Sequence, residues 1–67
     1  MYVISVITYH PYLVMKSYFN QDLIKLGSIK LATKFTSYDE ASVASYDLQL
    51  IDSEYDMVAS IEKLDNL

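Results

Sequence analysis

The sequence predicts an α+β domain, in which a small antiparallel sheet (element order β-β-β-α-β) has one helix packed on one face. Three observations predict this class. Residues 2–9 and 12–19 are rich in the β-branched and aromatic types that favour strands. From Tyr38 to about Asp52, apolar residues recur at helical spacing. Met57 to Leu64 alternates again, which predicts a closing strand, with Asp65-Asn66-Leu67 as a tail.

Length and composition favour a single domain covering residues 1–67. With 52% hydrophobic residues, one glycine and one proline, the chain is too apolar for a disordered segment. A domain of this size buries only about 60% of its unfolded surface, so its stability is marginal. Because cysteine is absent, no disulfide or thiolate metal site can reinforce the fold. We expect a cytoplasmic protein that gains burial by docking on a partner or by forming a homodimer.

The first two runs predict an antiparallel hairpin. Pro11 has no backbone donor and biases His10 toward extended geometry, which ends the first run. The short connection favours pairing of the two runs with each other. In the second run, Leu13, Met15 and Phe19 fall on one face.

The segment between hairpin and helix has two interpretations. Residues 20–22, Asn-Gln-Asp, are turn formers. After them, Gly27-Ser28 is typical of a two-residue hairpin turn, but Gly27 is also compatible with the end of a single helical turn beginning at Asp22. We expect a short third strand over residues 29–35, ending at Phe35.

The start of the helix has the clearest local signal. Ser37 and Glu40 form a capping box, in which the Ser37 hydroxyl accepts from the Glu40 amide and the Glu40 carboxylate reaches back to the Ser37 amide. The negative charges of Asp39 and Glu40 also complement the helix dipole. The expected buried stripe is Ala41, Ala44, Leu48 and Ile51. A second apolar row, expected to face solvent or a partner in part, is Val43, Tyr46 and Leu50.

Charge is divided unevenly along the chain. Residues 1–34 contain four lysines and one aspartate, a net +3, whereas residues 35–67 contain eight carboxylates and one lysine, a net −7. Such a field favours a partner with a basic surface, although a charged face can also serve solubility alone. Tyrosines, which are enriched at interface hot spots, lie among the carboxylates. The candidate partner-binding residues are Tyr38, Asp39, Glu40, Tyr46, Asp47, Asp52, Glu54 and Asp56.

We expect no enzymatic activity, no metal and no cofactor. The one histidine, His10, precedes a proline in an expected exposed turn, without a pocket or an orienting partner. The sequence contains no Gly-x-Ser-x-Gly elbow and no glycine-rich phosphate loop. The acidic run from Asp52 begins like a calcium loop, but Met57 stands where glycine is needed and Lys63 where a bidentate glutamate is required.

Residues 32–41 match the pattern A-x-x-F-x-S-x-x-E-A. In this element, and in the order of its strands and helix, the chain resembles small uncharacterised accessory proteins of phages and prophages of Gram-positive bacteria. The resemblance implies a phage-encoded protein in the host cytoplasm that binds and inhibits a host enzyme or a defence complex. It supplies no catalytic residues.

Three functions from different classes follow as hypotheses. The favoured one is a small acidic inhibitor or modulator of a nucleic-acid-handling host or defence protein, of the anti-CRISPR type or as a replication or repressor antagonist. Direct nucleic-acid binding is disfavoured, because the chain has no arginine and a net charge of −4. The third is a self-assembling structural module that pairs through a strand edge or the second apolar row. No membrane partner is expected, since no stretch approaches the roughly 20 apolar residues of a span.

Overall fold

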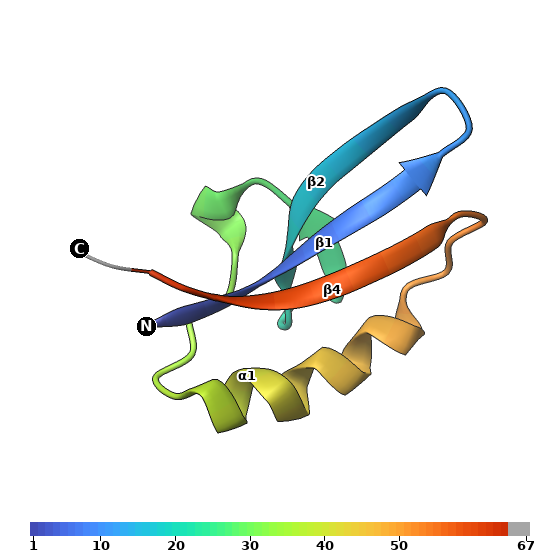
Figure 1. Ribbon diagram of the computed structural model, residues 1–67. Coiled ribbons are helices and arrows are strands. Elements are labelled where there is room, and N and C mark those ends of the chain that lie inside the picture. The colour runs from blue at the N-terminus through green and yellow to red at the C-terminus, as the bar shows by residue number, and fades with distance from the viewer. Residues whose placement is uncertain (65–67) are drawn as a thin grey trace.

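A four-stranded antiparallel sheet, in the order β3-β2-β1-β4, has a helical layer across one face in the computed structural model (Figure 1). The structure describes residues 1–64, and the expected tail, residues 65–67, lies outside them. The strands are β1 (Tyr2–His10), β2 (Leu13–Asn20), β3 (Lys25–Gly27) and β4 (Asp56–Lys63). The helical layer is α1 (Tyr38–Ala44) followed directly by the 3-10 helix η2 (Ser45–Leu50), and a second 3-10 helix, η1 (Ile29–Leu31), follows β3. The predicted α+β class and element order are confirmed.

The central strand of the sheet is β1. Its antiparallel pairing with β2 closes a hairpin at His10 and Leu13, and its pairing with β4 runs from Tyr2–Lys63 to Tyr9–Asp56. Four consecutive residues of β1, Val3, Ile4, Ser5 and Val6, are buried. Successive strand residues point to opposite faces, so this burial shows that β1 is covered on both sides at its amino end. Burial of both faces explains why the sequence of β1 is apolar at consecutive positions rather than at every second one.

The third strand lies earlier than the sequence predicted. The strand expected over residues 29–35 is wrong, because β3 is residues 25–27 and residues 29–31 form η1. Phe35 makes only an isolated bridge, to Tyr2. Both interpretations of Gly27-Ser28 are also wrong, since the turn occupies residues 21–24 and precedes β3.

The side chain of Asn20 accounts for this early turn. Its Oδ1 accepts from the Leu23 amide at 2.9 Å, and its Nδ2 donates to the Leu31 carbonyl at 2.6 Å. The first bond stabilises the turn and the second fastens η1 beside the end of β2. The turn ends at Ile24, whose φ of 51° is unusual for a β-branched residue.

The helix begins where the sequence predicted. The Ser37 hydroxyl accepts from the Glu40 amide at 3.1 Å, which is the expected N-cap. The other half of the capping box is wrong, because the Glu40 carboxylate accepts from the Thr36 hydroxyl at 3.0 Å and lies 3.4 Å from the Thr36 amide. The carboxylate therefore still supports the segment that enters the helix, one residue earlier than expected.

The end of the helix differs from the prediction. The α-helix expected to reach about Asp52 ends at Ala44, and 3-10 geometry continues to Leu50. The Ser45 hydroxyl donates to the Ser42 carbonyl at 2.6 Å, a local bond that competes with the regular helical ladder at the point of change.

The main core lies between the helical layer and the sheet. Its buried cluster is Ile4, Val6, Phe19, Phe35, Ala41, Ala44 and Leu48. The predicted helical stripe is confirmed, with Ile51 half-buried at its end. Leu13 and Met15, predicted on the same face as Phe19, are exposed because the β1–β2 hairpin projects away from the helical layer (Figure 1).

Candidate functional site

The eight candidate residues lie in three groups along the helical layer. The first turn of α1 contains Tyr38, Asp39 and Glu40, η2 contains Tyr46 and Asp47, and the segment that leads into β4 contains Asp52, Glu54 and Asp56. Figure 1 shows that the first turn of α1 and the segment leading into β4 lie at opposite ends of this layer. The six carboxylates therefore form a strip along the layer rather than a cluster at one end. We call Asp39, Glu40, Asp47, Asp52, Glu54 and Asp56 the acidic strip.

Three large apolar residues lie on the outer side of the helical layer. Val43, Tyr46 and Leu50, which we call the apolar row, are between 64% and 70% exposed. Ala44 and Leu48 on the same helical layer are buried against the sheet, so the layer is apolar on both its inner and its outer side. An outer row of this size is unusual for a monomeric surface helix, whose outer side is normally polar.

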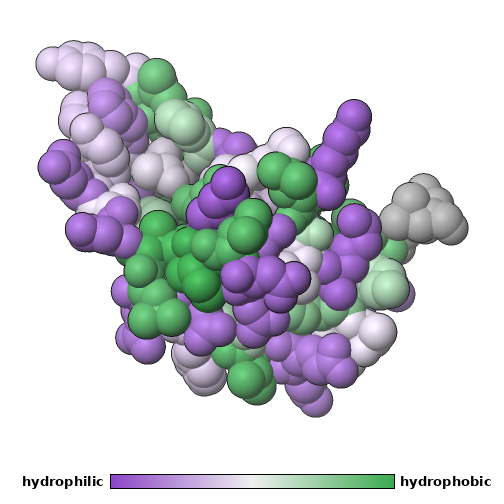
Figure 2. All heavy atoms as spheres, turned by 180° about the vertical axis from the view of Figure 1, so that it is seen from behind, coloured by the Kyte–Doolittle hydropathy of each residue, from purple (hydrophilic) through white to green (hydrophobic). Residues whose placement is uncertain are grey.

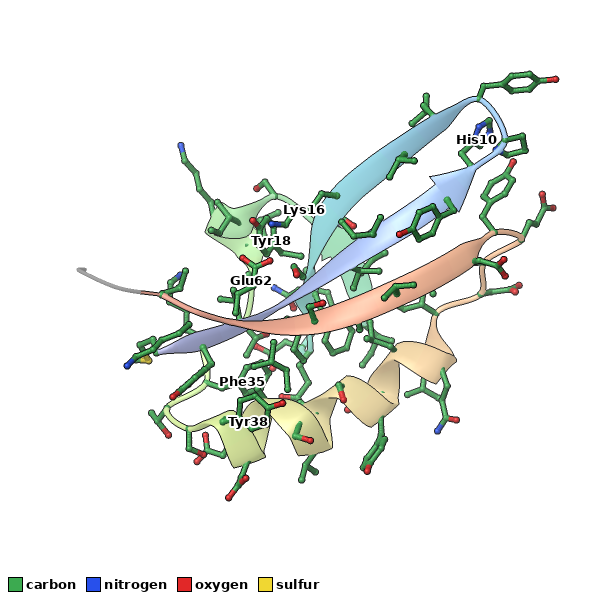
Figure 3. The ribbon with its side chains drawn as sticks, in the orientation of Figure 1. His10, Lys16, Tyr18, Phe35, Tyr38 and Glu62 are labelled. Atoms are coloured by element: carbon green, nitrogen blue, oxygen red, sulfur yellow. The ribbon has the colours of Figure 1, made fainter. Side chains whose placement is uncertain are left out.

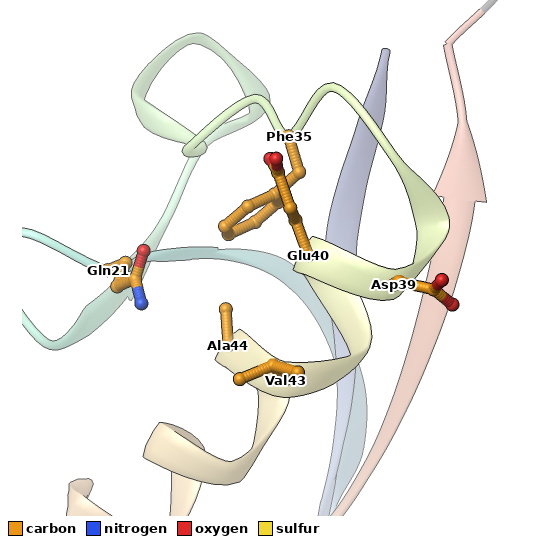
Figure 4. Close-up of a pocket in the computed structure, with 6 residues that line it drawn as sticks. All are labelled: Gln21, Phe35, Asp39, Glu40, Val43 and Ala44. Atoms are coloured by element: carbon orange, nitrogen blue, oxygen red, sulfur yellow. The ribbon is translucent and has the colours of Figure 1, made fainter.

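A shallow cleft lies between α1 and the turn after β2 (Figure 4). It encloses about 460 Å³, and its lining is Gln21, Phe35, Asp39, Glu40, Val43 and Ala44. In Figure 4, Glu40 lies beside Phe35, and Gln21 faces them from the opposite side. The cleft therefore has apolar lining from Phe35 and Ala44. It also includes one end of the acidic strip, at Asp39 and Glu40, and one member of the apolar row, Val43.

Neutral groups hold two of the six carboxylates in place. Asp47 accepts from Gln21 Nε2 at 3.3 Å, and Glu40 accepts from Thr36. A neutral donor orients a carboxylate without cancelling its charge. The strip therefore keeps its negative charge while these two side chains are partly ordered.

The ion pair that the structure shows within residues 1–64 lies on the sheet, away from the acidic strip. Lys16 Nζ on β2 is 2.9 Å from Glu62 Oε2 on β4, and it lies 5.6 Å from the centre of the Tyr18 ring (Figure 3). Across the described part of the chain, no lysine forms a salt bridge with any carboxylate of the strip. The one lysine of the β1–β2 hairpin, Lys16, is therefore paired with a carboxylate outside the strip.

The Lys16–Glu62 pair shifts the pKa of both partners. The pKa of the Glu62 carboxyl is lowered, first by a hydrogen bond from the Ser5 hydroxyl and then by Lys16. The Ser5 hydroxyl also lies 3.4 Å from the Ser60 carbonyl, but an ionised carboxylate is the stronger acceptor. The pKa of Lys16 is raised, chiefly by its hydrogen bond to Glu62.

His10 is not the isolated turn residue that the sequence predicted. It ends β1, is half-buried, and its ring lies 4.6 Å from that of Tyr55 and 5.8 Å from that of Tyr12. Its Nδ1 accepts from the Tyr12 amide at 3.1 Å. This aromatic contact joins the hairpin tip to the segment that leads into β4. Sequence reasoning missed it because Tyr55 is distant in the chain.

The tyrosines of the candidate set differ in their surroundings. Tyr38 is exposed, but its ring packs edge-on against Tyr2 with 6.1 Å between ring centres. Tyr46 is the more exposed of the two and belongs to the apolar row. Of the two, Tyr46 therefore has the larger area available to a partner.

Sequence reasoning also missed the participation of Gln21. This residue lies in a turn that the sequence assigned only to chain reversal, yet it lines the cleft and bonds to Asp47. No local pattern links positions 21 and 47, because their contact arises only when β2 and the helical layer pack on each other.

Two further findings concern the described residues. Among the described residues, no group of three histidine, aspartate or glutamate side chains is placed to hold a metal ion. Each helix in residues 1–64 is too short or too polar to cross a membrane. The candidate site consists of the cleft, the acidic strip and the apolar row.

Comparisons with known proteins provide no relative for this arrangement. No protein-family model, no curated protein and no solved structure matches the chain.

Proposed function

We propose that this protein is a binding module whose helical layer docks on a basic surface of another protein. The observation that carries the proposal is the exposed apolar row flanked by carboxylates that have no lysine partner in the described residues. Burial of one large apolar side chain stabilises a complex by roughly 1.5–3 kcal/mol before ordering costs. The apolar row supplies affinity, and the acidic strip supplies orientation and a fast association rate.

A nucleic-acid-handling protein fits this role as the partner. Surfaces that bind nucleic-acid backbones gather lysine and arginine to neutralise phosphates. The acidic strip offers negative charges to the same side chains, and Tyr46 offers flat contact area. Docking there places the module in competition with nucleic acid for the basic surface.

The most specific form of the proposal is a phage-encoded inhibitor in the host cytoplasm. In this form, as an anti-CRISPR protein or as a replication or repressor antagonist, the module would act by covering a basic, nucleic-acid-binding surface of its target. The resemblance of residues 32–41 to phage accessory proteins supports this form, and the charge and exposure of the helical layer support the broader one.

The experiment that tests the proposal starts from the heparin-binding fraction of a bacterial lysate, which is enriched in basic nucleic-acid-handling proteins. Captured proteins are identified by mass spectrometry, and the affinity of a purified partner is then measured. Tyr46→Ala is expected to weaken binding by a factor of about 30, which corresponds to the ~2 kcal/mol of an interface hot spot. Tyr12→Ala is the matched control, because Tyr12 is 90% exposed at the hairpin tip, outside the helical layer.

Two outcomes would contradict the proposal. One is equal loss of affinity in Tyr46→Ala and Tyr12→Ala, which would separate binding from the helical layer. The other is a complex whose affinity does not change between low and physiological ionic strength, since exposed charges across an interface are screened by salt.

A further inference from the structure

One edge of the sheet is open over half the length of β2. On one side β2 pairs with β1 from Leu13 onward, but on the other side β3 pairs only with residues 18–20. Within residues 1–64, the outward backbone groups of residues 13–17 therefore have no strand partner. An open edge of this kind is a ready template for pairing with another chain.

The side chains along this open edge are mainly apolar. Leu13, Val14 and Met15 are between 50% and 62% exposed, because the hairpin projects beyond the helical layer. Figure 2, which views the molecule from behind, shows apolar side chains gathered between the projecting hairpin and the helical layer. The edge thus combines unpaired backbone groups with apolar area.

The one charged residue of this edge is turned away from it. A lysine on an edge strand commonly protects the edge from pairing. Here Lys16 extends over Tyr18 and across β1 to Glu62, with 2.9 Å between Nζ and Oε2 (Figure 3). Its ammonium group lies over the sheet face, so the outer edge of β2 is left without its usual protection.

The opposite edge of the sheet is less suited to self-pairing. The outer edge strand there is β4, which begins at Asp56 and contains Glu62 near its end. If two copies of β4 paired antiparallel about Ala59, Asp56 of each copy would face Glu62 of the other. Like charges directly opposite each other destabilise a strand pair.

We propose that two copies of this chain pair antiparallel through residues 13–17 of β2, which joins their sheets into one. The occupant of the edge is a second copy because the segment is self-complementary. Pairing about Met15, its midpoint, places Leu13 opposite Ser17 of the second copy and Val14 opposite the aliphatic stem of Lys16 of the second copy. No two charges of the same sign face each other in this register.

Charge distribution supports the same edge. Each copy has a net charge of −4, which opposes association, but residues 13–17 contain no carboxylate. The acidic strip belongs to the helical layer and to the segment leading into β4, not to β2. Added salt screens the repulsion between the two copies, so the dimer is expected to strengthen with ionic strength. Binding to a basic partner is expected to weaken with ionic strength, so the two kinds of association are distinguishable.

Single cysteines test this dimer cleanly, because the chain has none of its own. Met15→Cys places two thiols directly opposite each other, with Cβ atoms about 5 Å apart. Val58→Cys is the matched control, since Val58 on β4 is 51% exposed and Met15 is 52% exposed. With a short bismaleimide, the Met15→Cys protein is expected to give at least fivefold more covalent dimer than the Val58→Cys protein. Equal yields from the two variants would overturn the proposal.

Sedimentation of the wild-type chain supplies the second measurement. The dimer fraction is expected to rise with protein concentration and with salt. Val14→Lys, which brings a second lysine beside Lys16 of the other copy, is expected to remove the dimer, and Val58→Lys is expected to retain it. A wild-type protein that stays monomeric across the concentration and salt range would overturn the proposal and leave the proposed docking of the helical layer unaffected.

Discussion

At the scale of single residues, the two sides of the helical layer differ sharply in their tolerance of charge. Ala44 and Leu48 are buried in the main core, whereas Val43, on the same layer, is 67% exposed. An unpaired charge in a core costs several kcal/mol, which is a large part of the stability of so small a domain.

Ala44→Asp or Leu48→Asp is therefore expected to unfold the protein at 25 °C. Val43→Asp is the control, and as an exposed substitution it is expected to change the free energy of unfolding by less than about 0.5 kcal/mol. Circular dichroism and urea denaturation measure both. A folded Leu48→Asp protein with the wild-type urea midpoint would show that the core is not where the structure places it.

The second prediction at this scale concerns the stability of the folded protein at acidic pH. The pKa of Glu62 is lowered in the folded protein, so the ionised side chain stabilises the fold. This stabilisation is fully present above the unfolded-state pKa of glutamate, about 4.3. It is lost as the pH falls through the lower pKa of the folded state. The Lys16 contribution has the opposite sense, since its raised pKa means that it is lost only at strongly alkaline pH.

Glu62→Gln is expected to reduce the difference between the urea midpoints at pH 7 and pH 3. The effect is expected to be modest, because the ion pair is largely exposed to solvent. The double variant with Lys16→Gln completes a mutant cycle that isolates the interaction of the pair. An unchanged pH profile in Glu62→Gln would show that this ion pair does not form in solution.

At the scale of elements, the start of the helix was predictable and its end was not. The Ser37 cap is a local signal over four residues, and the structure contains it. The change to 3-10 geometry after Ala44 coincides with a hydrogen bond from the Ser45 hydroxyl back to the Ser42 carbonyl, a choice that propensity does not encode. The third strand was mispredicted for a similar reason, because Asn20 fixes its turn through contacts reaching as far as Leu31.

Ser37→Ala is expected to lower the free energy of unfolding by about 1 kcal/mol, the usual cost of an N-cap. Ser28→Ala is the control, since Ser28 is exposed and its side chain makes no cap hydrogen bond at the start of η1. Urea denaturation of the two variants provides the comparison. Equal effects of both substitutions would indicate that the Ser37 cap contributes nothing specific to α1.

At the scale of the whole molecule, the order of the strand and helix patterns predicted the fold class and the sequence showed the division of charge, but neither predicted where the charged side chains lie relative to one another. The eight candidate residues follow the helical layer because α1 and η2 cross the face of the sheet, so the first turn of α1 and the start of β4 lie toward opposite ends of this layer (Figure 1). The cleft beside Gln21 and the open edge of β2 depend on the order β3-β2-β1-β4. A single sequence does not specify that order, since several orders bury the same apolar residues.

Docking on a partner and pairing of two copies are proposed for different parts of the molecule. The acidic strip and the apolar row follow the helical layer, whose outer side faces away from the sheet, whereas the open edge of β2 lies on the projecting hairpin. A dimer through β2 therefore leaves both helical layers free, and one assembly presents two docking surfaces. Such an arrangement raises apparent affinity for a partner with two matching sites through effective concentration.

The most direct test of the central claim is charge reversal in the acidic strip, measured as the association rate with the captured partner. Asp47→Lys with Asp52→Lys is expected to slow association at least tenfold at low salt, with little change in unfolding free energy, because both positions lie outside the buried stripe. Asp22→Lys is the control, an exposed carboxylate in the turn after β2 and outside the strip. An association rate that is the same in the double variant as in the wild-type protein would mean that the acidic strip is a solvated face and not a docking surface.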